Sequence, residues 1–236
     1  MSDQLKSIAF ATLIAVVCSV LLTGAATGLK ARKLRNIAVD RQKNILKSVG
    51  LIAHDEALDV AQIEQRYEQS IRCYVMDGNG RIMADTSASG GLPVCFHVKA
   101  GVPEAYILPV QSRGLWGKIH GYMAIENDGT TVAGFSVYSH SETPGLGGEI
   151  EKPWFQQNFI GKRIVDAAGT FASVKIAKGR VVDVIAADRQ ANYVDGISGA
   201  TLTGKYLTGG LKDLLMDYET LARQFRSGTV ALPADS

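Results

Sequence analysis

Four aliphatic hydroxyl side chains are crowded among glycines near the C-terminal end of the chain, in the stretch DGISGATLTGKYLTGG of residues 195–210. Ser198 is a candidate N-cap for a helix or helical turn that begins just after it. The unpaired amides and the dipole of such a helix start attract a phosphate, and Lys205 could add a positive charge. The stretch therefore indicates an anion site, with a plain glycine-rich turn that caps a helix as the structural alternative.

A second glycine-rich stretch, ETPGLGG at residues 142–148, directly follows a predicted strand. Its glycines at positions 145, 147 and 148 would let main-chain amides approach a flat or anionic ligand that a side chain would exclude. The Pro-Gly pair also predicts a turn, so a simple strand-to-helix connection is the competing interpretation.

Several common chemistries have no motif in this sequence. The four histidines form neither an HExxH pattern nor a pair at i,i+4 spacing, and the three cysteines include no CxxC, so no metal or iron–sulfur site is predicted. A GxSxG elbow and a Walker phosphate loop are also absent, and we assign no catalytic residue. The formal net charge of +2 gives no indication of nucleic-acid binding.

An uncharged, apolar run from Ser7 to Leu29 predicts a transmembrane helix over residues 7–29. At a rise of about 1.5 Å per residue, this helix matches a hydrocarbon core of roughly 30 Å. A cleaved signal peptide is the alternative because small residues lie near its end, but the apolar region of signal peptides usually spans only about 7 to 15 residues. The basic residues between Lys30 and Arg35 would, by the positive-inside tendency, keep the rest of the chain in the cytoplasm.

Hydrophobic periodicity divides the rest of the chain into a juxtamembrane helical segment, residues 30–70, and a domain over residues 71–236. The juxtamembrane segment contains predicted helices over residues 36–50 and 55–67. In the domain, a final helix is predicted over residues 207–225, and alternating patterns with turn dipeptides predict three β-hairpins. The hairpins pair residues 71–77 with 81–85, 119–126 with 132–139, and 173–177 with 181–187. The predicted fold class is α+β: a single N-terminal transmembrane helix is followed by a domain of antiparallel hairpins with flanking helices.

The cysteines leave two interpretations open. Cys18 lies inside the predicted span, whereas Cys73 and Cys95 lie in the domain. Two buried free thiols are the plainer interpretation of this pair, and a disulfide is the alternative if the domain lies outside the cytoplasm.

The run Asp195–Thr201 resembles the flavinylation motif of the FMN-binding domain family. In that family a dedicated flavin transferase joins FMN, through its phosphate, to the hydroxyl of the last threonine of the motif. The resemblance implies that Thr201 carries the covalent FMN, that Thr203 is the nearest rival, and that Asp195 helps to orient the threonine or holds the transferase's metal. The small residues that would let this segment enter the transferase are Ser198, Gly199 and Ala200.

The whole chain is similar to the C subunits of bacterial sodium-translocating NADH:quinone oxidoreductases. The similarity is carried, in the same order, by the N-terminal span, the Gly-Leu-Trp segment at 114–116, ETPGLGGEIE at 142–151 and SGATLT at 198–203. The further flavin-binding residues that it implies are Glu142, Thr143, Gly145, Leu146, Trp116 and Lys205. Leu146 would pack on the flavin ring, Trp116 would lie near the isoalloxazine unless it is a plain core residue, and Lys205 would lie near the phosphate.

The resemblance implies an electron-transfer subunit that relays electrons through FMN and is not catalytic alone. NADH oxidation and quinone reduction would take place on other membrane, flavin and iron–sulfur subunits of the same complex. The protein would be a single-pass protein of the bacterial inner membrane with a periplasmic flavin domain, against the charge bias of residues 30–35. The alternatives are the G subunit of the related ferredoxin:NAD+ electron-transport complex, and a non-catalytic membrane-anchored sensor domain for a small molecule.

Overall fold

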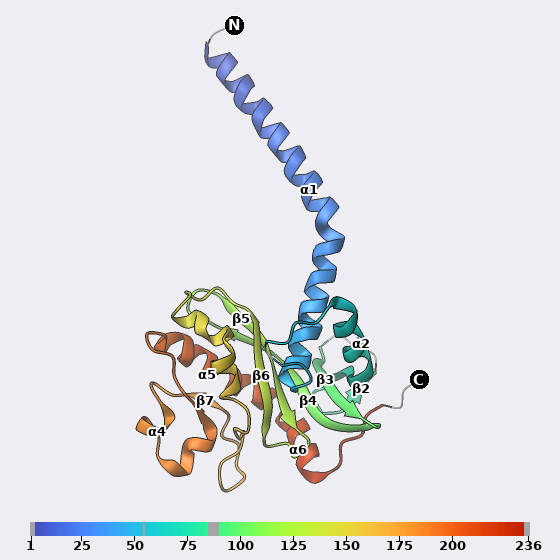
Figure 1. The fold of residues 1–236 in the computed structure, drawn as a ribbon, viewed down its shortest axis with the longest axis vertical. Helices are drawn as coiled ribbons and strands as arrows, with labels where there is room; N and C mark the ends of the chain where they lie inside the picture. The colour runs from blue at the N-terminus through green and yellow to red at the C-terminus, as the bar shows by residue number, and fades with distance from the viewer. Residues whose placement is uncertain (1–2, 54, 85–89, 234–236) are drawn as a thin grey trace. The chain divides into compact units, whose positions relative to one another are not determined.

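A computed structural model describes residues 3–53, 55–84 and 90–233 of the chain. The chain divides into two units, one that ends at Asp40 and one that begins at Arg41. Helix α1 (Asp3–Ser48) runs through the first unit without interruption, so the predicted span and the helix expected at 36–50 are parts of one helix (Figure 1). By length and composition α1 can cross a membrane. The single N-terminal apolar helix is confirmed.

Helix α2 (Val60–Ser70) begins later than the predicted start at Asp55. Asp59 is its N-cap: the carboxylate accepts from the amide of Gln62 at 2.8 Å, and the Gln62 side chain accepts from the amide of Asp59 at 3.0 Å. This reciprocal capping box satisfies two of the amides that a helix start leaves unpaired, and it therefore sets the first turn of α2.

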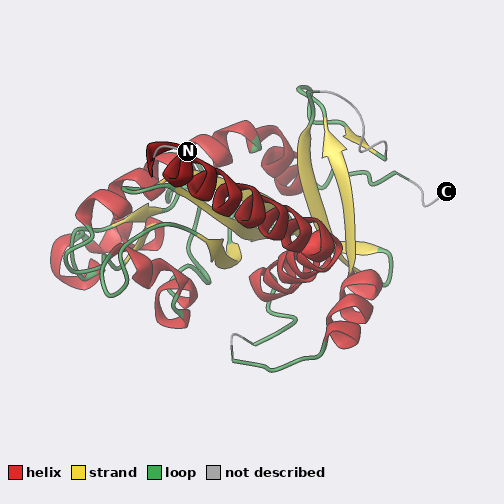
Figure 2. Ribbon diagram, turned by 90° about the horizontal axis from the view of Figure 1, so that it is seen from above, coloured by secondary structure: helices red, strands yellow, loops and turns green. Residues whose placement is uncertain are grey.

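Six antiparallel strands form the main sheet of the second unit, in the order β2-β1-β3-β4-β5-β6. Figures 1 and 2 draw the strands as arrows from two directions. Their bounds are β1 Ile71–Met76, β2 Ile82–Met83, β3 Leu92–Lys99, β4 Val102–Arg113, β5 Lys118–Glu126 and β6 Val132–Ser139. The predicted hairpins β1-β2 and β5-β6 are confirmed. Strands β3 and β4 were not predicted from the sequence.

Helices α5 (Thr201–Asp217) and α6 (Glu219–Ser227) pack their apolar side chains against one face of this sheet. The ring of Phe225 on α6 stacks on Tyr106 of β4 at a centroid distance of 4.7 Å. Because successive strand residues point to opposite faces, Phe135 of β6 enters this core while Ser136 points away from it. The hydroxyl of Ser136 donates to the main-chain oxygen of Asn44 at 2.9 Å, so the end of α1 lies on the other face.

The predicted final helix, residues 207–225, is in fact these two helices. It starts six residues earlier than expected, at Thr201, and it breaks at Tyr218. The Tyr218 hydroxyl donates to the main-chain oxygen of Pro93 at 2.5 Å, which ties the break to the start of β3.

The third predicted hairpin is wrong. Strand β7 (Lys175–Ile176) pairs in parallel with β8 (Tyr193–Val194), and residues expected to form its partner instead form helix α4 (Val181–Val184). The carboxylate of Asp195 accepts from the amide of Val181 at 2.6 Å. This bond satisfies a free amide at the start of α4 and favours the helical turn over a strand. The remaining short helices are η1 Gly147–Glu151, α3 Pro153–Gln157 and η2 Ala187–Asn192.

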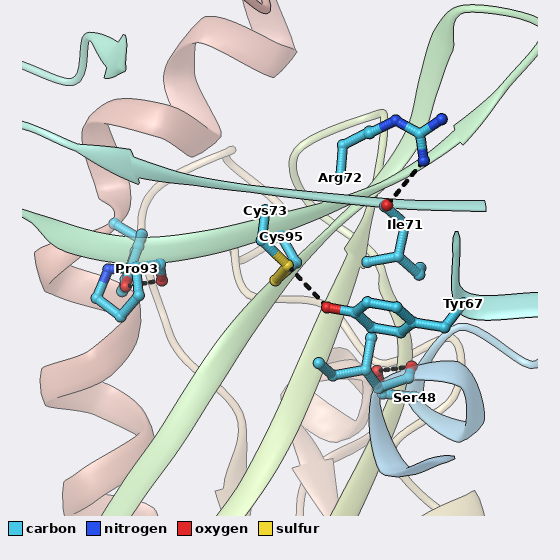
Figure 3. Close-up of a disulfide and its surroundings, with 9 residues drawn as sticks. Ser48, Tyr67, Ile71, Arg72, Cys73, Pro93 and Cys95 are labelled. Carbon is cyan, nitrogen blue, oxygen red and sulfur yellow. Dashed lines mark hydrogen bonds between the residues drawn. A yellow bond between two sulfur atoms is a disulfide. The ribbon is translucent and has the colours of Figure 1, made fainter. Parts of the chain in front are cut away.

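Cys73 and Cys95 form a disulfide between β1 and β3, where they stand directly opposite each other (Figure 3). The expectation of two buried free thiols is therefore wrong, because the antiparallel register brings residues 22 positions apart into contact. Cys73 is exposed, and the hydroxyl of Tyr67 lies 3.2 Å from its sulfur.

The turn between β5 and β6 is held by Asp128. Its Oδ1 accepts from the amides of Thr130 and Thr131 at 2.7 and 2.8 Å, and its Oδ2 accepts from their hydroxyls at 2.7 and 2.6 Å. Partial burial alone would raise the pKa of this carboxyl, but the four hydrogen bonds outweigh burial and hold the pKa below its ordinary value.

We predict that Asp128→Ala lowers the stability of the domain by about 1 kcal/mol at neutral pH because four hydrogen bonds to a charged but exposed group are lost. A carboxyl with a depressed folded pKa contributes stability above its unfolded pKa of about 4, and that contribution disappears as the pH falls through the folded value. Melting temperatures of the two proteins should therefore converge in acid. Asp213→Ala, which removes an exposed carboxylate on α5, is the control, and a gap of constant size at every pH would contradict the prediction.

Candidate functional site

The carboxylate of Glu142 joins three segments that are far apart in the sequence. Its Oε1 accepts from the main-chain amide of Trp116, in the turn between β4 and β5, at 2.9 Å. Its Oε2 accepts from the hydroxyl of Thr203, in the first turn of α5, at 2.5 Å. Glu142 is 5% exposed and Thr203 is 2% exposed. A buried carboxylate is tolerated only when donors replace water, so these two bonds hold the segments together.

Two glycines leave the space that this carboxylate occupies. A Cβ atom on Gly114 would lie 2.5 Å from Oε1 of Glu142, and one on Gly147 would lie 2.7 Å from Oε2 and 2.6 Å from the Thr203 hydroxyl. All three contacts are closer than carbon and oxygen tolerate. Gly147 of the ETPGLGG stretch is therefore required for packing around Glu142.

The ETPGLGG loop closes on its own main chain. The carbonyl of Thr143 accepts from the amides of Leu146 and Gly148 at 3.1 and 2.9 Å. Gly145 lies at the tip with a φ of +75°, a conformation that favours glycine. Two of the amides that the sequence suggested for a ligand are thus used within the loop, while the side chains of Thr143 and Leu146 stay exposed.

The N-cap residue of α5 is not the one that the sequence predicted. Ala200, and not Ser198, occupies the N-cap position, and Ala200 has no side chain that could cap. Its amide donates to the carbonyl of Ile197 at 3.1 Å in a tight turn that precedes the helix. Gly199 has a φ of +73°, and a Cβ there would lie 2.7 Å from the Leu146 side chain. Ser198 and Gly199 are exposed, so this turn presents a slim surface directly before Thr201.

Thr201 and Thr203 have opposite environments. Thr203 is buried and bound to Glu142, whereas Thr201, the first residue of α5, is exposed. Residues two positions apart on an α-helix point about 200° away from each other. The inward anchoring of Thr203 therefore turns the Thr201 hydroxyl outward, where a modifying enzyme could reach it.

Large apolar side chains are exposed in all three segments that Glu142 joins. Trp116 is 69% exposed, so the alternative that it is a plain core residue is wrong. The other exposed apolar residues of these segments are Leu115, Leu146 and Leu202. A hollow of about 630 Å³ is lined by residues 111–118. Exposed apolar surface of this kind marks a place where a flat ring system or a partner can pack.

Lys205 and Asp195 are the two remaining charged residues that the sequence suggested for the site. Lys205 is exposed one turn after Thr201, and it lines a second hollow of about 780 Å³ together with Arg113 and Tyr206. The guanidinium of Arg113 lies 4.8 Å from the centre of the Tyr206 ring. Asp195 uses one carboxylate oxygen to accept from Val181, so its observed contact is structural. Within the described ranges 3–53, 55–84 and 90–233, no three potential ligands among His, Cys, Asp and Glu cluster as a metal site would require.

These residues fit a phosphate-linked flavin. The exposed hydroxyl of Thr201 stands at the N-terminus of a 17-residue helix, where the helix dipole favours an anion. Trp116 and Leu146 offer exposed apolar surface for an aromatic ring system.

Comparison with known proteins agrees with this chemistry. The sequence profile of the FMN-binding domain matches residues 114–216, the part of the chain that holds all three segments of the site. The fold and the site thus define an FMN-binding domain that follows an N-terminal apolar helix in the sequence.

The chain belongs to the family of the C subunits of Na(+)-translocating NADH-quinone reductases. It is 33% identical over 229 residues to the C subunit from Yersinia pestis, with 84% of this chain and 83% of the relative covered. It is 31% identical over 231 residues to the one from Pseudomonas aeruginosa, with coverages of 85% and 87%. The crystal structure of the C subunit from Parabacteroides distasonis superposes with a TM-score of 0.69 at 29% identity, and the match covers 82% of this chain and 96% of the other.

We predict that Thr203→Val destabilises the unmodified domain by about 2 kcal/mol because it removes the donor that the buried Glu142 carboxylate requires. Thr201→Val is the matched control, since the same change at an exposed position should cost less than about 0.5 kcal/mol. Denaturant unfolding of both variants and the wild type measures the difference. Equal stability of the two variants would show that the bond between Thr203 and Glu142 does not hold the site together.

Proposed function

We propose that the protein is the covalent-FMN electron-transfer subunit of a sodium-translocating NADH:quinone reductase, with the flavin joined to Thr201 by a phosphoester. The observation that carries the proposal is the contrast between the two threonines of the SGATLT stretch: the hydroxyl of Thr201 is exposed and that of Thr203 is buried and bonded. Family membership and the FMN-binding domain match support it.

In the attachment step, the Thr201 oxygen would form a bond to the phosphorus of a flavin phosphoanhydride that a flavin transferase presents. The anhydride bond of the donor would break, the nucleotide part would leave, and the proton of the Thr201 hydroxyl would be released to the transferase. Ser198, Gly199 and Ala200 are small residues directly ahead of Thr201, which would suit a segment that enters another enzyme's active site. The start of α5 and Lys205 would offset the negative charge of the phosphodiester.

The bound flavin supplies the redox chemistry, and the protein supplies its position. Leu146 and Trp116 would pack on the ring, and the main chain of Thr143 and Gly145 would border it. The Glu142 carboxylate already has two donors inside the protein. We therefore propose that Glu142 positions the segments that contact the flavin.

The exposed Cys73 and its disulfide support a periplasmic domain, because accessible disulfides persist in oxidising compartments. This favours the periplasm over the cytoplasmic placement suggested by the basic residues at 30–35. Helix α1 would anchor the protein in the bacterial inner membrane, and the partners would be the other membrane, flavin and iron–sulfur subunits of the complex. NADH oxidation and quinone reduction would belong to those partners.

The relatives favour this assignment over the G subunit of the ferredoxin-linked complex, since the similar proteins named above are C subunits of NADH-quinone reductases. A non-catalytic small-molecule sensor domain would carry no covalent flavin, so detection of FMN on Thr201 discriminates between these classes.

We predict that the full-length protein, produced together with a flavin transferase, carries in-gel flavin fluorescence and the added mass of FMN after denaturation. Thr201→Val should abolish both signals because it removes the oxygen that would bond to the phosphate. Thr203→Ser retains the donor to Glu142 and should keep the flavin. A wild-type protein that never acquires flavin under these conditions would overturn the proposed function.

The periplasmic placement predicts that Ala167→Cys, at an exposed position of the domain, reacts with a membrane-impermeant maleimide in cells whose outer membrane admits the reagent. The experiment is done with Cys18→Ser, so that the introduced thiol is the only one outside the Cys73–Cys95 disulfide. A permeant maleimide is the control for accessibility. Labelling only after the inner membrane is disrupted would place the domain in the cytoplasm.

A further inference from the structure

His140 bridges the two ends of the segment that carries the ETPGLGG loop. It follows β6 directly, and its imidazole Nδ1 accepts from the main-chain amide of Glu142 at 3.1 Å. Its Nε2 lies 3.2 Å from Oε2 of Glu151, the last residue of η1. The His140 side chain is only 12% exposed. One ring therefore contacts both the residue that begins the loop and the last residue of η1, the short helix that follows it.

The two contacts allow only one arrangement of the neutral ring. A main-chain N–H can only donate, so Nδ1 of His140 must carry no proton where it meets the Glu142 amide. The ring proton then resides on Nε2, from which it is donated to the Glu151 carboxylate. A carboxylate partner of this kind fixes both the tautomer and the orientation of an imidazole.

Glu151 is itself held in place. The side-chain amide of Gln156, 3% exposed, donates to the main-chain oxygen of Glu151 at 3.0 Å. The Glu151 carboxylate also lies 3.5 Å from Nζ of Lys152. A chain of contacts thus runs from the buried Gln156 through Glu151 and His140 to Glu142.

Glu142 connects this chain of contacts to the site, because its carboxylate accepts from the amide of Trp116 and from the hydroxyl of Thr203. We infer that His140, oriented by Glu151, is a positioning residue of the flavin site: it holds the main chain of Glu142 so that the Glu142 carboxylate aligns the Trp116 turn with the start of α5. This inference rests on the proposed function only where it concerns the flavin.

Two variants of His140 distinguish a role that depends on the hydrogen bond to the Glu142 amide from a role in packing alone. The side-chain oxygen of Asn in His140→Asn can take the place of Nδ1 and accept from the Glu142 amide. The longer side chain in His140→Gln places its amide group near Glu151, so the Glu142 amide loses its acceptor. Both variants replace the ring by an amide of similar polarity, so a difference between them reports on the hydrogen bond to Glu142.

The first measurement uses the full-length protein in detergent without flavin. Hydrogen exchange of the peptide that contains the Trp116 amide should be about tenfold faster in His140→Gln and within about twofold of wild type in His140→Asn, as expected for loss or retention of one hydrogen bond. Glu149→Gln is the control, since Glu149 lies on η1 like Glu151 but its carboxylate accepts from the Trp154 indole N–H of α3 at 3.1 Å. Equal exchange in the Asn and Gln variants would overturn the inference.

The second measurement is the rate at which each variant acquires FMN from the flavin transferase, together with the visible circular dichroism spectrum of the bound flavin. We expect His140→Asn to match the wild type and His140→Gln to acquire flavin about tenfold more slowly. Equal rates and equal spectra in both variants would contradict the role of His140. A wild type that lacks flavin would instead contradict the proposed function, and the exchange measurement would still decide the role of His140.

Discussion

The buried carboxylate of Glu142 is the constraint on which the geometry of the site depends. A charge removed from water must be matched by donors, and here the donors come from segments 26 and 61 residues away in the sequence. The β4-β5 turn, the loop after β6 and the start of α5 must therefore be in place together. The glycines at 114 and 147 follow from the same constraint, since any side chain at either position would occupy the space of the carboxylate.

The orientation of α5 about its own axis also follows from this bond. With Thr203 directed inward, helical geometry directs Thr201 outward. Further along the helix, Gly210 allows close approach to Ser112 of β4, whose hydroxyl bonds the carbonyl of Tyr206. The glycines and hydroxyls of the DGISGATLTGKYLTGG stretch thus have separate structural roles: Gly199 forms a tight turn, Thr203 is buried and bonded, Gly210 permits a close helix-to-strand contact, and Thr201 is exposed at the start of α5.

Much of the fold could be predicted from periodicity, and the failures have physical causes. The β1-β2 and β5-β6 hairpins were found because their strands alternate and their turns contain Asp-Gly or Asn-Asp-Gly. Strand β4 was missed because residues 105–108 are all buried, so alternation disappears, and because two prolines interrupt it. The hairpin expected at 173–187 failed since Asp195, distant in sequence from Val181, favours a helical turn there.

The sequence by itself determined the apolar N-terminal helix, the α+β class and the motifs that associate the chain with FMN, because these depend on composition, period and local spacing. Only the tertiary structure decided that Thr203 is buried while Thr201 is exposed, that Glu142 has its donors within the protein, and that Cys73 pairs with Cys95. Each of these depends on contacts between segments far apart in the chain. Burial and hydrogen-bond satisfaction are properties of such contacts, and local sequence patterns do not contain them.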